Sequence, residues 1–315
     1  MGIFRRKKKA DASVGSAPDP DLPLEVAQAQ RLRSMVRQVF AESGREVSVY
    51  ADHVVDDQGV ELGLWNLAAT VRHLPPPDWE EAVRAHVAII DRSPIAGGAN
   101  ELDDLDEREL TVATYARVVE HGSMPGEWHT GVGRPAEGLA TVLAVDLPEL
   151  VSTPASSWWE ERGGERRWLA TGLANLRALA ISDELEHERL ELDSGASFEV
   201  VMGDSFFTAS TGLVVDHLSR RFVGVDPGEL GALVAMPFRH QVAFRLLEPG
   251  IETVLSLHHL FGFAQRGYAE GAGPVSPHVF WVRGGQWQQV TRVDGDQAAV
   301  VVDDELGEAL GILEE

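Results

Sequence analysis

Apolar positions along this chain recur in two patterns, one with the period of a helix and one typical of short paired strands. Spacings of three and four residues predict amphipathic helices over 25–41, 65–74, 78–90, 165–180, 205–222 and 251–269. Runs rich in β-branched and aromatic residues predict strands over 47–55, 60–65, 110–119, 139–147, 187–192, 197–202, 231–237, 242–247, 279–284, 286–290 and 298–302.

The predicted strands come mostly in neighbouring pairs, and helices separate one pair from the next. This order predicts an α+β fold, in which antiparallel or mixed sheets built from paired short strands alternate with covering helices. A chain of 315 residues is long enough for one large core or for two intimate halves, here about 24–150 and 151–315. Residues 1–23 are predicted to be a disordered tail with a basic head, because they are otherwise small, polar and Pro-containing.

The use of cysteine and lysine excludes several kinds of chemistry. The chain has no cysteine, which excludes disulfides, thiolate zinc sites, iron–sulfur clusters and a cysteine nucleophile and is consistent with a cytoplasmic protein. Its only lysines are Lys7, Lys8 and Lys9, so the body has no lysine for a P-loop, a kinase strand or a Schiff base. We therefore exclude P-loop NTPases and pyridoxal enzymes, and we expect no cofactor.

The charge is distributed unevenly between the head and the body. The formal net charge is −23, and so acidic a surface repels phosphate backbones, which argues against nucleic acid as a partner. The head could nevertheless contact an anionic membrane surface weakly, at about 1 kcal/mol per basic residue; the alternative is a solubilising, disordered start. The residues that would make this contact are Ile3, Phe4, Arg5, Arg6, Lys7, Lys8 and Lys9.

One short block, Gly203-Asp204-Ser205, matches the first block of the GDS-type serine esterases. A hydrolase of that type would use Ser205 as its nucleophile and would need a base and oxyanion donors besides. No Gly-x-Asn-Asp block and no Asp-x-x-His follows Ser205. The alternative is that Asp204 or Ser205 caps the helix expected to begin near Phe206, by accepting bonds from its first amide groups.

A second polar pair, Arg239-His240, falls at the expected turn between two strands. Such a turn can present Arg239 and His240, with Asp204, to a ligand or a protein partner, and His240 is the distant histidine that could serve Ser205. An ordinary polar hairpin tip explains the pair equally well. The eleven histidines contain no His-Glu-x-x-His, no His-x-His and no helical pair four residues apart, so we expect no metal site.

Several short blocks stand in an order that resembles one known family. The blocks are LGLWNLAATVRHL, LATVLAVDLPE, LATGLANLRAL, GDSFFTAS, ALVAMPFRH and GPVSPHVFW. Over roughly residues 45–302 this order is similar to the YtpQ-like proteins, a bacterial family of unknown function. The resemblance implies a cytoplasmic bacterial α+β protein and supplies no catalytic or binding residues.

Two hypotheses of different class follow. The first is a non-enzymatic binding or accessory protein. It would bind an unknown small ligand or protein partner and could rest on the membrane through its head. The second is a serine hydrolase that uses Ser205 with a distant histidine such as His240.

Overall fold

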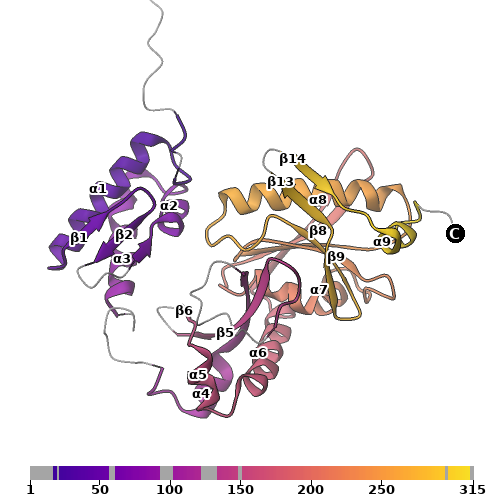
Figure 1. Ribbon diagram of the computed structural model, residues 1–315, viewed down its shortest axis with the longest axis horizontal. Helices are drawn as coiled ribbons and strands as arrows, with labels where there is room; N and C mark the ends of the chain where they lie inside the picture. The colour runs from indigo at the N-terminus through magenta and orange to yellow at the C-terminus, as the bar shows by residue number, and fades with distance from the viewer. Residues whose placement is uncertain are drawn as a thin grey trace, which may run out of the picture. The chain divides into compact units, whose positions relative to one another are not determined.

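The computed structural model describes residues 17–19, 21–56, 61–92, 102–121, 133–147, 151–294 and 297–312. Helices and antiparallel sheets are interleaved along the chain, which confirms the predicted α+β fold (Figure 1). The chain divides into two compact units, an N-terminal unit, Met1–Gly98, and a C-terminal unit, Ala99–Glu315.

The chain divides at another place than the two halves that the sequence suggested. Residue 150 is not where the chain divides, because Asp146 pairs with Val151 across one antiparallel ladder. Residues before 23 already pack against the unit, because Leu22 is only 3% exposed and the Asp19 carboxylate lies 2.9 Å from the Arg33 guanidinium. The head residues 3–9, predicted to contact a membrane, lie outside the described residues.

The N-terminal unit packs three helices and a small sheet around one core. Its elements are α1 (Val26–Glu42), β1 (Val47–Val49), β2 (His53–Asp56), β3 (Glu61–Gly63), α2 (Trp65–Val71), the 3-10 helix η1 (Pro76–Asp78) and α3 (Trp79–Arg92). Leu32 and Phe40 of α1 are buried with Trp79 and Val83 of α3, because each helix places these apolar residues on one face. The expected strand over 47–55 is instead a hairpin, in which the amide of Tyr50 donates to the carbonyl of His53 at 2.8 Å and β1 pairs with β2.

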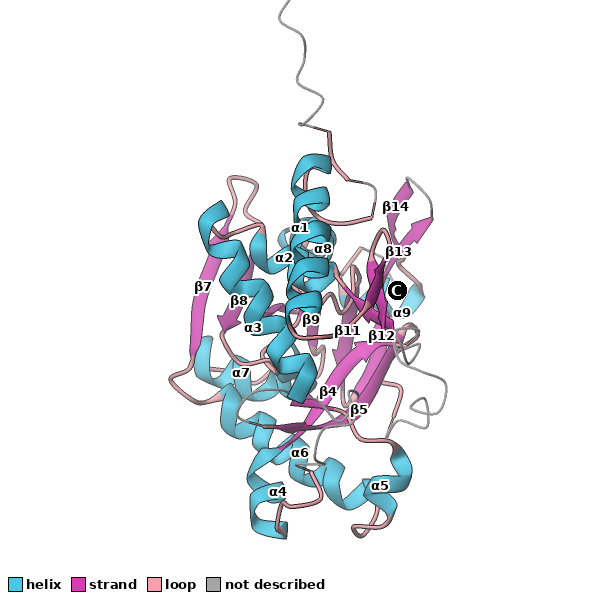
Figure 2. Ribbon diagram, turned by 90° about the vertical axis from the view of Figure 1, so that its left-hand side faces the viewer, coloured by secondary structure: helices cyan, strands magenta, loops and turns pink. Residues whose placement is uncertain are grey.

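The C-terminal unit is built on a six-stranded antiparallel sheet in the order β12-β11-β9-β10-β8-β7, seen from β7 at the left to β12 at the right in Figure 2. A three-stranded sheet, β4-β5-β6, and a hairpin, β13-β14, complete its strands. The strands are β4 (Thr114–Glu120), β5 (Leu139–Asp146), β6 (Val151–Ser152), β7 (Leu185–Glu191), β8 (Ser197–Gly203), β9 (Ala232–Phe238), β10 (Gln241–Leu246), β11 (Val279–Arg283), β12 (Gln286–Gln289), β13 (Thr291–Asp294) and β14 (Gln297–Val300). The helices are α4 (Glu107–Ala113), α5 (Ser156–Glu160), α6 (Glu165–Ala180), η4 (Ala209–Val214, a 3-10 helix), α7 (Val215–Phe222), α8 (Ile251–Glu270) and α9 (Asp304–Ala309).

Both faces of the six-stranded sheet are covered. In β9, Leu233 and Ala235 pack into the cluster formed with α8, while Val234 and Met236 pack into the cluster on the opposite face. This alternation follows from the two-residue period of a strand, and α8 runs beside β8 and β9 in Figure 1. On the opposite face lie η4, α7 and α6, together with β4.

Two expected elements have a different structure in the C-terminal unit. Residues 110–113, expected to begin a strand, belong to α4, whose first turn is closed by a capping box between Asp106 and Glu109. The Asp-x-x-Glu spacing was the signal for this helix. Residues 205–222, expected to be one helix, form a turn, then η4 and only then α7.

Helix α6 lies unusually close to β4. A Cβ atom added to Gly172 would lie 2.4 Å from the amide nitrogen of Ala116, so only glycine allows this approach. Close packing here fixes β4, and with it the side chains that β4 carries toward the rest of the unit. Within the described ranges, no helix is long and apolar enough to cross a bilayer.

Candidate functional site

The Gly203-Asp204-Ser205 block lies where β8 ends and the turn toward η4 begins. The Ser205 hydroxyl accepts a hydrogen bond from the Phe207 amide at 3.2 Å, and the Ser205 carbonyl accepts one from the Thr208 amide at 3.1 Å. The Thr208 hydroxyl also donates to the Ser205 carbonyl, at 2.8 Å. The serine therefore holds a tight turn, in the manner of residues that bond to nearby backbone.

His240 lies near this turn, and both of its ring nitrogens have protein partners. Nδ1 donates to the Gly203 carbonyl at 3.1 Å, and Nε2 accepts from Nε of Arg239 at 2.9 Å. Burial lowers the pKa of His240, and the adjacent Arg239 charge lowers it further. The ring is thus a neutral imidazole whose acceptor nitrogen is already used. In the part of the chain that the structure describes, no histidine ring is hydrogen-bonded to the Ser205 hydroxyl.

Asp204 and His240 line a pocket of about 320 Å³ at this junction. Besides these two, its lining residues are Glu184, Glu186, Met202, Gly203 and Phe238. The pocket is acidic, yet no group of three or more acidic or histidine side chains among the described residues could hold a metal ion. The structure therefore places Asp204 and Arg239 near His240, but does not assemble a serine with a base.

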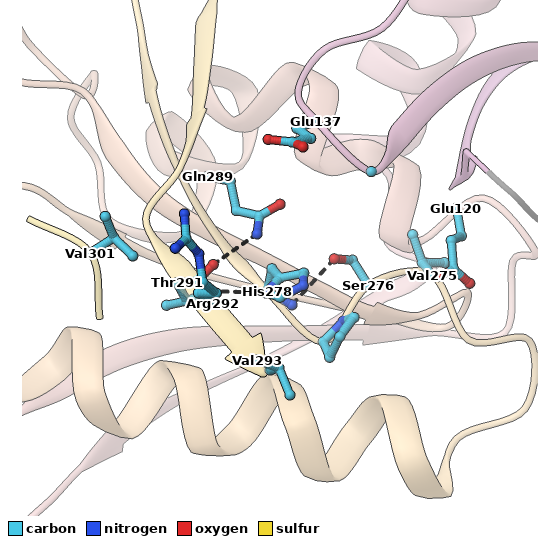
Figure 3. Close-up of a pocket in the computed structure, with 12 residues that line it drawn as sticks. Glu120, Glu137, Val275, Ser276, His278, Gln289, Thr291, Arg292, Val293 and Val301 are labelled. Atoms are coloured by element: carbon cyan, nitrogen blue, oxygen red, sulfur yellow. Dashed lines mark hydrogen bonds between the residues drawn. The ribbon is translucent and has the colours of Figure 1, made fainter. Parts of the chain in front are cut away.

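A larger pocket, of about 410 Å³, lies elsewhere in the C-terminal unit (Figure 3). Its walls come from the end of β4, the segments before β5 and β11, the end of β12, and β13. The lining residues are Glu120, Glu137, Gly138, Val275, Ser276, Pro277, His278, Gln289, Thr291, Arg292, Val293 and Val301. We call it the His278 pocket, because this ring lies at the centre of the labelled side chains in Figure 3.

One ring nitrogen of His278 lies beside a buried threonine. Thr291, 1% exposed, accepts the Val279 amide through its hydroxyl oxygen at 2.9 Å and lies 3.3 Å from Nδ1 of His278. Because the hydroxyl hydrogen has no other acceptor among the described residues, we assign it to Nδ1. Nδ1 is then the acceptor and Nε2 carries the proton. Nε2 makes no hydrogen bond with the described residues. Burial lowers the pKa of His278, against the opposing effect of the Glu120 charge, so the ring is a neutral donor.

The other polar groups of the His278 pocket supply both donors and acceptors. The Glu120 carboxylate accepts from the Tyr268 hydroxyl at 3.1 Å, and burial together with this carboxylate raises the pKa of Tyr268 to about 12. Gln289 is fixed by a bond from its amide to the Thr291 carbonyl at 2.8 Å. The side chains of Glu137 and Arg292 are exposed at the pocket. A ligand here would meet carboxylates, an amide, a guanidinium and a neutral imidazole.

Sequence reasoning missed the His278 pocket. Its residues come from separate stretches with no regular spacing, and GPVSPHVFW, which contains Ser276 and His278, was used only as a block of the family resemblance. A histidine and two hydroxyl residues next to predicted strand ends were the available signal. That signal is weak, because nothing in the sequence places Thr291 beside His278.

Comparison with known proteins gives no further indication. Scans of family models, of curated proteins and of solved structures found no match to this chain. The resemblance to the YtpQ-like proteins therefore stays a prediction from the sequence blocks.

Proposed function

We propose that this protein is a non-enzymatic binding protein whose C-terminal unit holds a small polar molecule in the His278 pocket. The observation that carries the proposal is the oriented imidazole of His278, whose Nε2 donor has no partner among the described residues in a pocket of about 410 Å³. Ligand sites in proteins commonly have volumes of this order, with a few polar groups that fix the ligand's orientation.

The hydroxyl groups near His278 favour binding over nucleophilic chemistry. Ser276, 4% exposed, accepts the His278 amide through its hydroxyl at 3.2 Å, and the Thr291 hydroxyl is used as described above. An activated nucleophile needs a base that takes its proton and an oxygen that the substrate can reach, whereas the Thr291 oxygen is buried, at 1% residue exposure, and already accepts the Val279 amide. The pocket is thus better suited to recognise hydroxyl, amine or carboxylate groups than to attack them.

The test is a binding screen with defined probes. Amino acids, monosaccharides and short polyols are added singly to the full chain, and ligand-induced changes in the thermal midpoint and in the His278 ring resonances are recorded. We expect at least one class to shift both. His278→Ala and Glu120→Gln should then raise its Kd at least about tenfold, since each removes one polar contact.

His73→Ala is the matched control, because His73 is an exposed histidine of the N-terminal unit. It should leave the Kd unchanged. A probe that binds both His278→Ala and Glu120→Gln as tightly as the unaltered chain would show that its site is not this pocket. No shift with any probe class would contradict the proposal itself.

The serine hydrolase is the competing proposal, and a covalent probe separates the two. A fluorophosphonate reagent should leave the folded chain unlabelled if Ser205 only holds its turn. Labelling that disappears in Ser205→Ala would instead support catalysis, with His240 released from Arg239 to act as the base.

We also propose that the basic head contacts an anionic membrane surface, and this proposal rests on the sequence of the head alone. Deletion of residues 2–9 should abolish cofractionation with vesicles of anionic lipid at low salt, while vesicles of zwitterionic lipid serve as the control. Equal binding of the full and the shortened chain to anionic vesicles would rule out the head as the contact.

A further inference from the structure

Two arginines from distant parts of the C-terminal unit stack on one aromatic ring. The guanidinium carbon of Arg117, on β4, lies 4.5 Å from the centroid of the Phe206 ring, and that of Arg239, between β9 and β10, lies 4.8 Å from it. Each side chain is partly buried. A cation over a ring face is stabilised by the negative potential of the ring, but two cations at one ring also repel each other.

These two arginines differ from the other stacked arginines of the unit. Four others also lie over aromatic rings, and each has a carboxylate partner: Arg162 with Asp103, Arg167 with Glu107, Arg221 with Asp183 and Arg283 with Glu305. Neither Arg117 nor Arg239 forms an ion pair within the described part of the chain. In a protein of net charge −23, acidic partners are abundant, so two unpaired cations that share one ring require an explanation.

The positive charge of this pair persists at neutral pH. Burial, with a further contribution from Arg239, lowers the pKa of Arg117 to about 10, which still leaves the guanidinium protonated at pH 7. Burial also lowers the pKa of Arg239. Because neither group gives up its proton, the Phe206 ring offsets only part of the cost of bringing two partly desolvated cations together, and a negative charge from outside the pair would offset more of it.

The hydrogen-bond donors of the pair are only partly used. Arg117 donates one bond, from Nη1 to the Thr153 hydroxyl at 3.4 Å, and Arg239 donates one, from Nε to His240 at 2.9 Å. Its bond to His240 holds Arg239 in place, and its two terminal amino groups have no hydrogen-bond partner among the described residues. Guanidinium groups with paired free donors match the oxygens of carboxylate and phosphate.

We propose that Arg117, Phe206 and Arg239 form a binding site for a small oxyanion that carries two or more negative charges, as a phosphate, a diphosphate or a dicarboxylate does. The site is distinct from the His278 pocket, so it adds to the proposed function and does not depend on it. The nearby Asp204 carboxylate acts on His240 and forms no ion pair with either arginine, so the guanidinium groups remain available to the ligand.

The experiment measures binding of sodium phosphate, pyrophosphate and succinate to the full chain, by calorimetry and by thermal midpoint, with sodium chloride at equal ionic strength and pH as the reference. We expect a saturable rise in the midpoint with at least one oxyanion and none with chloride. A stronger response to the phosphates or to succinate identifies the oxyanion class.

Variants then locate the site. Arg117→Met and Arg239→Met should each weaken binding at least about tenfold, since each removes a charge-assisted contact. Arg283→Met is the matched control, because Arg283 stacks on Trp281 at 4.5 Å but is paired with Glu305, and its binding should equal that of the unaltered chain.

Two results would overturn the proposal. One is the absence of a saturable response in the unaltered chain. The other is an equal rise in all three variants, which would be the general stabilisation that phosphate and related salts exert on buried surface. Should one arginine variant fail to fold, the other together with Arg283→Met still decides between a local site and a general salt effect.

Discussion

His240 and His278 are both half-buried histidines of the C-terminal unit, and burial lowers the pKa of each. They differ in what their ring nitrogens contact. Both ring nitrogens of His240 are hydrogen-bonded within the protein, one to the Gly203 carbonyl and the other to Nε of Arg239. One ring nitrogen of His278 is hydrogen-bonded to the Thr291 hydroxyl, and the other has no partner among the described residues.

This comparison shows that a motif is a poor guide to which site is available. Ser205, in the block that matches an esterase motif, and His240, which lies near it, make hydrogen bonds that hold a turn. The histidine that no motif marked retains an oriented donor in a pocket. What separates the two histidines is the number of hydrogen-bonding ring atoms that have no partner among the described residues after folding.

The largest effect should come from the glycine of the motif. A Cβ atom at Gly203 would lie 2.8 Å from Cδ2 of Leu185 and 2.9 Å from Oγ1 of Thr208. We expect Gly203→Ala to lower the free energy of unfolding by about 2–3 kcal/mol, because it overpacks the junction. Urea denaturation measures this.

Gly262→Ala is the control, because Gly262 is exposed on α8 and nothing lies within 4 Å of its added Cβ. It should be neutral or stabilising, by up to about 1 kcal/mol. An equally small effect of Gly203→Ala would mean that the junction is not packed as described, and the contrast between the two sites would weaken.

A smaller effect should follow from Thr291→Val in the His278 pocket. The change leaves the buried Val279 amide without its acceptor, and we expect a loss of about 1–2 kcal/mol. It also removes the hydroxyl that we assign as the donor to Nδ1 of His278. Binding of any ligand found by the screen should therefore weaken by more than the loss of stability accounts for. Thr291→Ser, which keeps the hydroxyl, should restore ligand binding; if it does not, the hydroxyl does not orient the ring.

The property that the two histidines share predicts a dependence of stability on pH. Because the pKa of His240 and of His278 is lowered on folding, the unfolded chain binds protons at these residues first as pH falls below about 6.5. The free energy of unfolding should therefore decrease from pH 7 downward, by at most about 1.4 kcal/mol per pH unit for each histidine.

Denaturation curves at several pH values between 7.5 and 4.5 test this dependence. His240→Gln and His278→Gln should each flatten it, whereas His73→Gln should not. If neither substitution alters the slope, the two rings are not held neutral in the folded chain, and the shared property on which the comparison rests is lost.

Much of the C-terminal unit could be predicted from the sequence, because its elements have strong local signals. The helices over 165–180 and 251–269 and the strand pairs from β7 to β12 occur where periodicity placed them. The errors lie where two short elements share one apolar run. Residues 110–119 contain the end of α4 and most of β4, and residues 205–222 contain a turn, η4 and α7. A single helix or strand period therefore could not describe either stretch.

Less of the candidate sites could be predicted. The sequence indicated that Arg239 and His240 lie at a turn, and they do, between β9 and β10. It did not indicate that the turn lies against Gly203 or that Arg117 shares a ring with Arg239. Those contacts depend on strand order, which local patterns do not encode.

By itself, the sequence determined the alternation of helices and paired strands, the acidic charge, and the absence of cysteine and of body lysines with the chemistries that need them. These properties follow from residue types and their local spacing. Only the tertiary structure decided which polar groups meet and that Ser205 and His240 are used in holding a turn. It also decided that His278, Arg117 and Arg239 keep donors without a partner among the described residues. The physical reason is that the availability of a hydrogen-bonding atom depends on every neighbour that folding brings to it.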